Sequence, residues 1–130
     1  MPGELILIIE VNEKNRRLIR DVLRVKGYNT IDTETSEEGL KLALERSPAL
    51  ILMDIQLPGM DGITALRRLR AETKTRTIPI IAITASAMTH NRESMLAEGF
   101  DGYQPKPISL KDFLGEVQRV LDCRGGSAAS

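Results

Sequence analysis

Four polar residues of this 130-residue chain stand at the carboxyl ends of apolar runs: Glu10, Asp54, Thr84 and Lys106. Asp54 closes the most apolar run, residues 49–53, and a loop rich in proline and glycine follows it. Such a run predicts a strand buried on both faces of a parallel sheet. Taken alone, an acid or threonine here is usually a helix cap, and a lysine is usually a solvated surface charge. Together at one sheet edge, where open α/β sheets bind their ligands, the four predict a catalytic or binding site centred on Asp54.

Five short apolar runs supply the strands that would bring these side chains together. They are residues 5–9, 28–33, 49–53, 78–84 and 100–104. Stretches of helical periodicity alternate with the runs, which predicts parallel strands joined by right-handed crossovers. We therefore expect an α/β fold, with a flavodoxin-like doubly wound five-stranded parallel sheet of order 2-1-3-4-5 and five helices. Its switch point lies between the first and third strands, so Glu10 and Asp54 should face each other across a crevice.

The helices are predicted from apolar spacing and from capping residues. Their expected positions are residues 15–26, from Ser36 onward, after Gly62, from Met88 to Gly99, and from Ser109 onward. Ser36 is the expected N-cap of the second helix, because a serine hydroxyl can accept a backbone N–H and two glutamates follow it in the first turn.

Composition narrows the class of protein. Eighteen lysines and arginines balance eighteen aspartates and glutamates, so the net charge gives no indication of electrostatic binding to nucleic acid or membrane. The single cysteine, Cys123, cannot form an internal disulfide, and the apolar run at residues 5–9 is too short to be a membrane span or signal peptide. We expect a cytoplasmic protein with one domain at residues 1–123, followed by a flexible tail or expression remnant at 124–130.

The chain resembles the receiver domains of two-component response regulators over nearly its whole length. The stretches that carry the resemblance are residues 5–10, 51–62, 83–85 and 106–108, and their combination is highly specific. The sequence around these stretches is most similar to that of single-domain receivers and of the receiver modules of hybrid histidine kinases. The resemblance implies a phosphoprotein of signal transduction and phosphorelay, with a histidine kinase or histidine phosphotransfer protein as donor and a protein as downstream target.

The resemblance also implies a role for each site residue. Asp54 would be the phosphoacceptor, acting as nucleophile, while Lys106 pairs with the acyl phosphate and Thr84 moves to donate a hydrogen bond to it. A magnesium ion would be held by Glu10, Asp54 and the backbone carbonyl of Gln56.

A conformational switch is implied as well. In the family, the movement of the residue matched by Thr84 is coupled to the rotation of an aromatic side chain on the fifth strand, matched here by Tyr103. The change would alter the surface over the fourth helix, fifth strand and fifth helix. Partner contacts are expected around Asn12, Asn15 and Leu18 on the first helix and at Ile108 in the last loop.

One position departs from the family pattern, which has two adjacent acids after the first strand. Here Glu10 is followed by Val11, natural or engineered, in place of the acid that normally touches the metal. A valine offers no oxygen, so we expect magnesium to bind weakly. Two interpretations stay open: a phosphoacceptor with a weakened metal site, or a pseudo-receiver that binds partners without being phosphorylated.

Other classes of function fit the residues less well. Flavin binding usually needs a phosphate-cradling loop after the first strand, and residues 11–15 contain no glycine and carry an acid. A haloacid-dehalogenase-type phosphatase needs a second acid two residues beyond its nucleophile, and no aspartate after the first strand has that setting. A DNA-binding module is not expected either, because little chain follows the fifth helix. The expectation is therefore a self-phosphorylating and self-dephosphorylating switch, not an enzyme with turnover, whose output passes through protein contacts.

Overall fold

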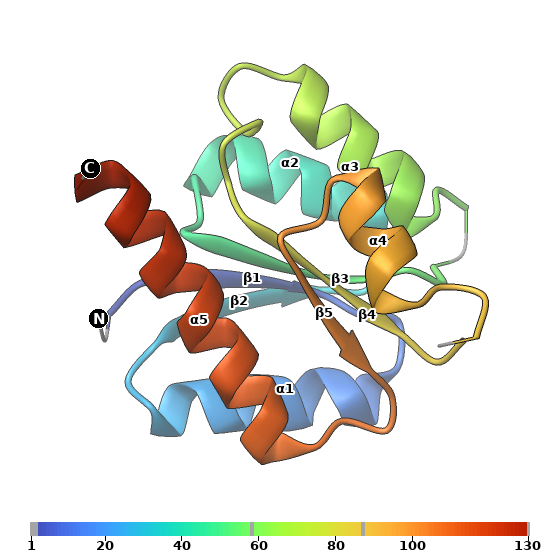
Figure 1. The fold of residues 1–130 in the computed structure, drawn as a ribbon, viewed down its shortest axis with the longest axis horizontal. Coiled ribbons are helices and arrows are strands. Elements are labelled where there is room, and N and C mark those ends of the chain that lie inside the picture. The colour runs from blue at the N-terminus through green and yellow to red at the C-terminus, as the bar shows by residue number, and fades with distance from the viewer. Residues whose placement is uncertain (1–2, 58, 87, 130) are drawn as a thin grey trace.

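The sheet has the predicted number and order of strands. The computed structural model describes residues 3–57, 59–86 and 88–129, with side chains to residue 122. Its strands are β1 (Leu5–Ile9), β2 (Asn29–Thr33), β3 (Leu50–Asp54), β4 (Ile80–Thr84) and β5 (Gly102–Pro105). All pairs are parallel and the order is β2-β1-β3-β4-β5, as Figure 1 shows, which confirms the predicted fold class.

Helices cover both faces of this sheet. They are α1 (Glu13–Val25), α2 (Ser36–Arg46), α3 (Gly62–Ala71), α4 (Arg92–Glu98) and α5 (Leu110–Ala129). Helices α1 and α5 lie on one face, and α2, α3 and α4 lie on the other (Figure 1). Two apolar layers result, one containing Leu23 and Phe113 and the other containing Leu66 and Met95. The central strands are buried on both faces, as their uninterrupted apolar runs predicted.

Strand register brings the expected residues to one edge. Ile9 is paired with Met53, so the residues that follow them, Glu10 and Asp54, leave the sheet side by side. Thr84 is paired with Pro105 at the end of β4, which places Lys106 next to this edge.

Helix α1 begins at Glu13, earlier than the expected residue 15, and the starts of α2 and α4 differ from the sequence prediction as well. The N-cap of α2 is Thr35, whose hydroxyl accepts the Glu38 N–H at 3.3 Å, while Ser36 is buried in the first turn. Helix α4 begins at Arg92 with Asn91 as its cap, so Met88 lies before the helix and is almost fully exposed. The α2 error arises because Thr35 and Ser36 could each accept a backbone N–H. The α4 error arises because the prediction counts Met88, which is exposed, among the apolar residues of that helix.

The end of the chain bears on the expected domain boundary. Helix α5 continues to Ala129, so the segment expected as a tail is helical over most of its length. The boundary at residue 123 stays a prediction, and Pro58, the Cys123 side chain and Ser130 lie outside what the structure describes. Among the helices of the described residues, none has both the length and the apolar character needed to cross a bilayer.

Candidate functional site

A lysine joins two buried carboxylates at the carboxyl edge of the sheet. Lys106 Nζ lies 3.2 Å from Asp54 Oδ2 and 3.1 Å from both carboxylate oxygens of Glu10. Both acids are almost fully buried, at 0% and 1% exposed, while the Lys106 side chain is 16% exposed. Three charged groups from β1, β3 and the loop after β5 therefore share one small volume, and one positive charge faces two acids.

The pKa of Glu10 is raised to about 7, chiefly because burial leaves a charged carboxylate poorly solvated there. A hydrogen bond with Asp54 and the repulsion of its charge contribute to this rise, whereas the Asn12 N–H and the Lys106 ammonium oppose it. Glu10 and Asp54 therefore compete for one lysine. A further cation, or protonation of Glu10, would relieve the excess negative charge.

The loop after β3 orients the Asp54 carboxylate. Gln56 N donates to Asp54 Oδ1 at 3.0 Å, while Lys106 is bonded to Oδ2. The loop then turns back, because Gly62 N donates to Ile55 O at 3.0 Å where α3 begins. Backbone atoms approach Gly62 so closely that a Cβ there would lie 2.7 Å from Asp54 O. The Asp54 side chain is thus fixed by its own loop as well as by Lys106.

Thr84 lies at the same edge, but its hydroxyl is bonded elsewhere. The side chain is buried and Oγ1 accepts the Ser86 N–H at 3.0 Å. Lys106 N donates to Thr84 O at 2.8 Å, which ties β4 to the lysine-bearing loop. Ser86 is itself bonded to the loop after β3, because Gln56 Nε2 donates to Ser86 Oγ at 2.8 Å. This bond links the loops after β3 and β4. Because Thr84 accepts in its bond with the Ser86 N–H, its own hydroxyl proton remains for donation.

Tyr103 is buried beneath a charged network formed by α4 and α5. The Arg92 guanidinium carbon lies 5.6 Å from the centroid of its ring, within reach of a cation–π contact. Tyr103 N donates to the Glu116 carboxylate at 2.8 Å, which also accepts from Arg92 and Arg119. Burial alone would raise the pKa of Glu116, but these hydrogen bonds and the two arginine charges hold it below its ordinary value. Tyr103 is therefore 6% exposed and linked to both flanking helices.

The oxygen atoms of this cluster are of the kind that could bind the magnesium ion implied by the resemblance. Glu10 and Asp54 supply carboxylate oxygens, which are ligands that magnesium prefers. Val11 is 41% exposed and adds no oxygen, and the described residues contain no group of three or more acidic, histidine or cysteine ligands. The residues present thus fit a magnesium ion that keeps most of its ligands as water.

The expected partner-contact residues are exposed or half-buried at the start of α1 and before α5. Asn12 caps α1 by accepting the Asn15 N–H at 3.0 Å, and Leu18 is 39% exposed on the same helix. Ile108 lies just after Lys106 and is half-buried against the apolar layer beneath α5. Their role as a contact surface stays a prediction.

Sequence reasoning missed two residues that the structure places around this cluster. Arg16, from the first turns of α1, donates to the backbone carbonyl of Glu10 at 2.9 Å. Ser86 bonds both Thr84 and Gln56. An arginine six residues after a buried acid, on the helix that starts there, was the available signal for the first. The second depends on the path of a loop and had none.

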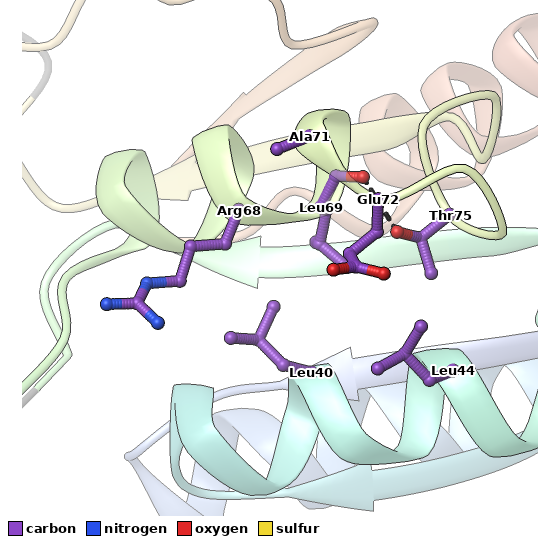
Figure 2. Close-up of a pocket in the computed structure, with 7 residues that line it drawn as sticks. All are labelled: Leu40, Leu44, Arg68, Leu69, Ala71, Glu72 and Thr75. Carbon is purple, nitrogen blue, oxygen red and sulfur yellow. Dashed lines mark hydrogen bonds between the residues drawn. The ribbon is translucent and has the colours of Figure 1, made fainter.

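A separate hollow lies between α2 and α3, away from the acid cluster. Figure 2 shows Leu40 and Leu44 of α2 facing Leu69 and Glu72 at the end of α3. Its volume is about 300 Å³, and Thr75 at its border donates its hydroxyl proton to Leu69 O at 2.7 Å. The hollow shares no residue with the cluster around Asp54, so the candidate chemistry stays with that cluster.

Comparison with known proteins gives a consistent picture. The family model for the response regulator receiver domain matches residues 6–118. The polar-differentiation response regulator DivK of Brucella ovis is 41% identical over 116 residues, covering 89% of this chain and 94% of that protein. The receiver domain of a Pseudomonas aeruginosa sensor histidine kinase, solved with magnesium coordinated in its active site cleft, is 34% identical, with a TM-score of 0.84 over 92% of this chain and 98% of that one. The signal receiver domain of a histidine kinase from Syntrophus aciditrophicus is 28% identical, with a TM-score of 0.83 over 92% and 91%.

Proposed function

The chain belongs to the response regulator receiver domain family of two-component signalling, and from this premise we propose that Asp54 is its phosphoacceptor. The observation that carries the proposal is the contact of Lys106 with two buried carboxylates, at 3.1 and 3.2 Å, where β1 and β3 end. Receiver domains interact with histidine kinases or histidine phosphotransfer proteins, so the donor would be a phosphohistidine. We infer that the chain is a switch in the cytoplasm and not an enzyme with turnover.

In phosphoryl transfer the protein mainly positions the reacting groups and neutralises the charge of the phosphoryl oxygens. An Asp54 oxygen attacks phosphorus, the new O–P bond forms, and the P–N bond to the histidine breaks with its electron pair going to the imidazole. Lys106, already at 3.2 Å from Asp54 Oδ2, neutralises charge on the phosphoryl oxygens, and Gln56 N–H holds the other carboxylate oxygen. Glu10, Asp54 and the Gln56 carbonyl would hold a magnesium ion, which would supply additional positive charge there.

The switch would follow from hydrogen bonding to the new phosphoryl group. Thr84, whose Oγ1 accepts the Ser86 N–H, would move to donate its own hydroxyl proton to a phosphoryl oxygen, and the space beside β5 would change for Tyr103. Arg92 and Glu116, which hold Tyr103 from α4 and α5, connect that change to the surface of both helices. We propose that a downstream protein reads this surface, without direct contact to nucleic acid or membrane.

The first prediction tests Asp54 itself. Incubation with a small acyl-phosphate donor and magnesium should add one phosphoryl group to the wild-type chain, measured by intact mass. Asp54→Asn should gain none, because an amide is not a nucleophile toward phosphorus. Asp112→Asn, an exposed change on α5, is the matched control and should behave as wild type. If neither the wild type nor the control gained mass, the chain would be a pseudo-receiver that acts by binding alone.

The second prediction concerns the position next to Glu10. Val11→Asp adds a carboxylate at the cleft and should tighten magnesium binding roughly tenfold or more, since affinity for hard cations rises with the number of charged oxygen ligands. Calorimetric titration of magnesium into the apo protein measures the change. Val25→Asp, at an 84% exposed position on α1, makes the same substitution away from the cleft and should leave affinity unchanged. Equal magnesium affinities in all three proteins would show that position 11 does not lie next to the bound ion.

A further inference from the structure

Arg16 connects the strand that carries Glu10 to the neighbouring edge strand. Its Nη1 donates to Glu10 O at 2.9 Å, and its Nε lies 3.1 Å from Asp32 Oδ2 on β2. Glu34 Oε2 is a weaker third partner, 3.6 Å from Nη1. The Arg16 side chain is only 15% exposed and the Asp32 side chain 21%, so these contacts are partly shielded from water. A guanidinium has several donors in a rigid plane and can hold the carbonyl and the carboxylate at the same time.

The peptide that Arg16 holds is the one that sets the direction of the Glu10 side chain. On its other side, Glu10 N donates to Thr33 O at 3.1 Å. Beyond it, Asn12 N donates to Glu10 Oε2 at 3.0 Å, so the loop closes on the carboxylate it carries. These three hydrogen bonds all involve Glu10, and Arg16 is the only one of their three donors that is a side chain.

The position of Glu10 matters because its carboxylate shares Lys106 with Asp54. A small displacement of the Glu10 backbone would change both distances from the ammonium, 3.1 Å to Glu10 and 3.2 Å to Asp54. The Val11 side chain has no oxygen with which to anchor the loop to a cation, so the geometry of the loop depends on the protein's own hydrogen bonds.

We propose that Arg16 is a positioning residue for phosphoryl transfer, which holds the Glu10 peptide against β2 and so places the Glu10 carboxylate beside Lys106 and Asp54. Arg16 does not touch the reacting atoms and acts only through Glu10. The proposal rests on the phosphoacceptor function of Asp54 for its consequence, and on the contacts of Arg16 for its cause. In this proposal α1 and β2, which contribute no group to the acid cluster, support it through Arg16 and Asp32.

The experiment compares Arg16→Gln with Arg17→Gln, the same change at the exposed neighbouring position on α1. The rate of phosphoryl incorporation from a small acyl-phosphate donor is measured over a range of magnesium concentrations. Arg16→Gln should lower the saturating rate about tenfold, since misplacing a group by a fraction of an ångström is costly in such reactions. It should also raise the magnesium concentration needed for half the rate, while the donor concentration at half-saturation changes little. Arg17→Gln should match wild type, and identical behaviour of the two variants would overturn the proposal.

A second readout does not depend on phosphorylation. The Asn12 amide is bonded to the Glu10 carboxylate, so its hydrogen exchange, measured by NMR, reports whether that carboxylate keeps its place. Exchange should accelerate in Arg16→Gln and stay at the wild-type rate in Arg17→Gln. A wild-type chain that gained no phosphoryl group would defeat the proposed function, whereas unchanged Asn12 exchange in Arg16→Gln would defeat the positioning inference.

Conservative variants guard against a chain that fails to fold. Arg16→Lys keeps the charge but cannot hold Glu10 O and Asp32 together, so its rate should fall between those of wild type and Arg16→Gln. Asp32→Asn keeps Arg16 and removes the charge that orients it, and it should slow the reaction in the same direction. Wild-type rates and exchange in both variants would overturn the proposal even if Arg16→Gln did not fold.

Discussion

Replacing Lys106 with methionine is expected to lower the free energy of unfolding by about 3–5 kcal/mol at pH 8, because removing one partner of a buried ion pair leaves its charges uncompensated. The lysine ammonium lies 3.1 Å from Glu10 and 3.2 Å from Asp54, and both acids are almost fully buried. Methionine has a similar length and is neutral, so the loss is mainly electrostatic. Urea denaturation followed by circular dichroism measures the effect, and phosphorylation of Asp54 should be lost as well.

The loss at Lys106 should depend on pH in a defined direction. The pKa of Glu10 is raised to about 7 by burial and by Asp54, and Lys106 is one of the groups that lower it. Removing the lysine therefore raises the pKa of Glu10 further, which favours the protonated carboxyl in the folded state. A group whose folded pKa is raised gives stability that is present below its unfolded pKa and is lost as the pH rises through the folded pKa. The variant should thus be closest to wild type near pH 5 and furthest from it at pH 8.

Lys111→Met is the matched control for this prediction, since Lys111 is an exposed lysine at the start of α5. Its unfolding should change by less than about 0.5 kcal/mol, as expected for a surface substitution. Equal stabilities of the Lys106 variant and wild type at pH 8 would mean that the two acids do not depend on the lysine.

Much of the fold could be predicted because the strands are marked by uninterrupted apolar runs. The run at residues 5–9 became β1 with the same bounds, and the third run, 49–53, became β3 shifted by one residue to Leu50–Asp54. The last strand was harder to bound, since Gly102–Pro105 has few apolar residues and is identified mainly by its place in the alternation. Helix starts were less certain for a local reason, seen at α2, where Thr35 caps the helix and Ser36 does not.

The candidate site was predictable to the extent that strand ends share an edge. This rule brought Glu10, Asp54 and Lys106 together before any distance was known, and the structure joins all three. Arg16 had only a weak signal, its place six residues after Glu10 on the following helix, because the direction of a long side chain decides its contact. The contact of Ser86 depends on the path of a loop, which no local pattern encodes. Position in the chain thus identified the three charged residues of the cluster, but not Arg16 and Ser86, which contact residues of the site from α1 and from the loop after β4.

Gly62→Ala is expected to destabilise the fold by about 1–3 kcal/mol, the usual cost of adding an atom to a packed site. Helix propensity alone gives the opposite sign, since alanine in a helix is favoured over glycine by about 1 kcal/mol. The steric term wins because an added Cβ would lie 2.7 Å from Asp54 O and 2.8 Å from Ile55 Cα. Both are backbone atoms, which cannot rotate away as a side chain does.

The same substitution at Gly115 isolates the propensity term. Nothing lies within 4 Å of a Cβ added there, so Gly115→Ala in α5 should stabilise the chain by about 0.5–1 kcal/mol. Urea denaturation of the two variants should therefore move in opposite directions from wild type. Because the Cβ at position 62 pushes on the carbonyl of Asp54 itself, Gly62→Ala should also slow phosphorylation, while Gly115→Ala should leave it unchanged. A stabilised Gly62→Ala with the wild-type phosphorylation rate would mean that the loop after β3 yields freely, and that Asp54 is held in place by Lys106 without help from its own backbone.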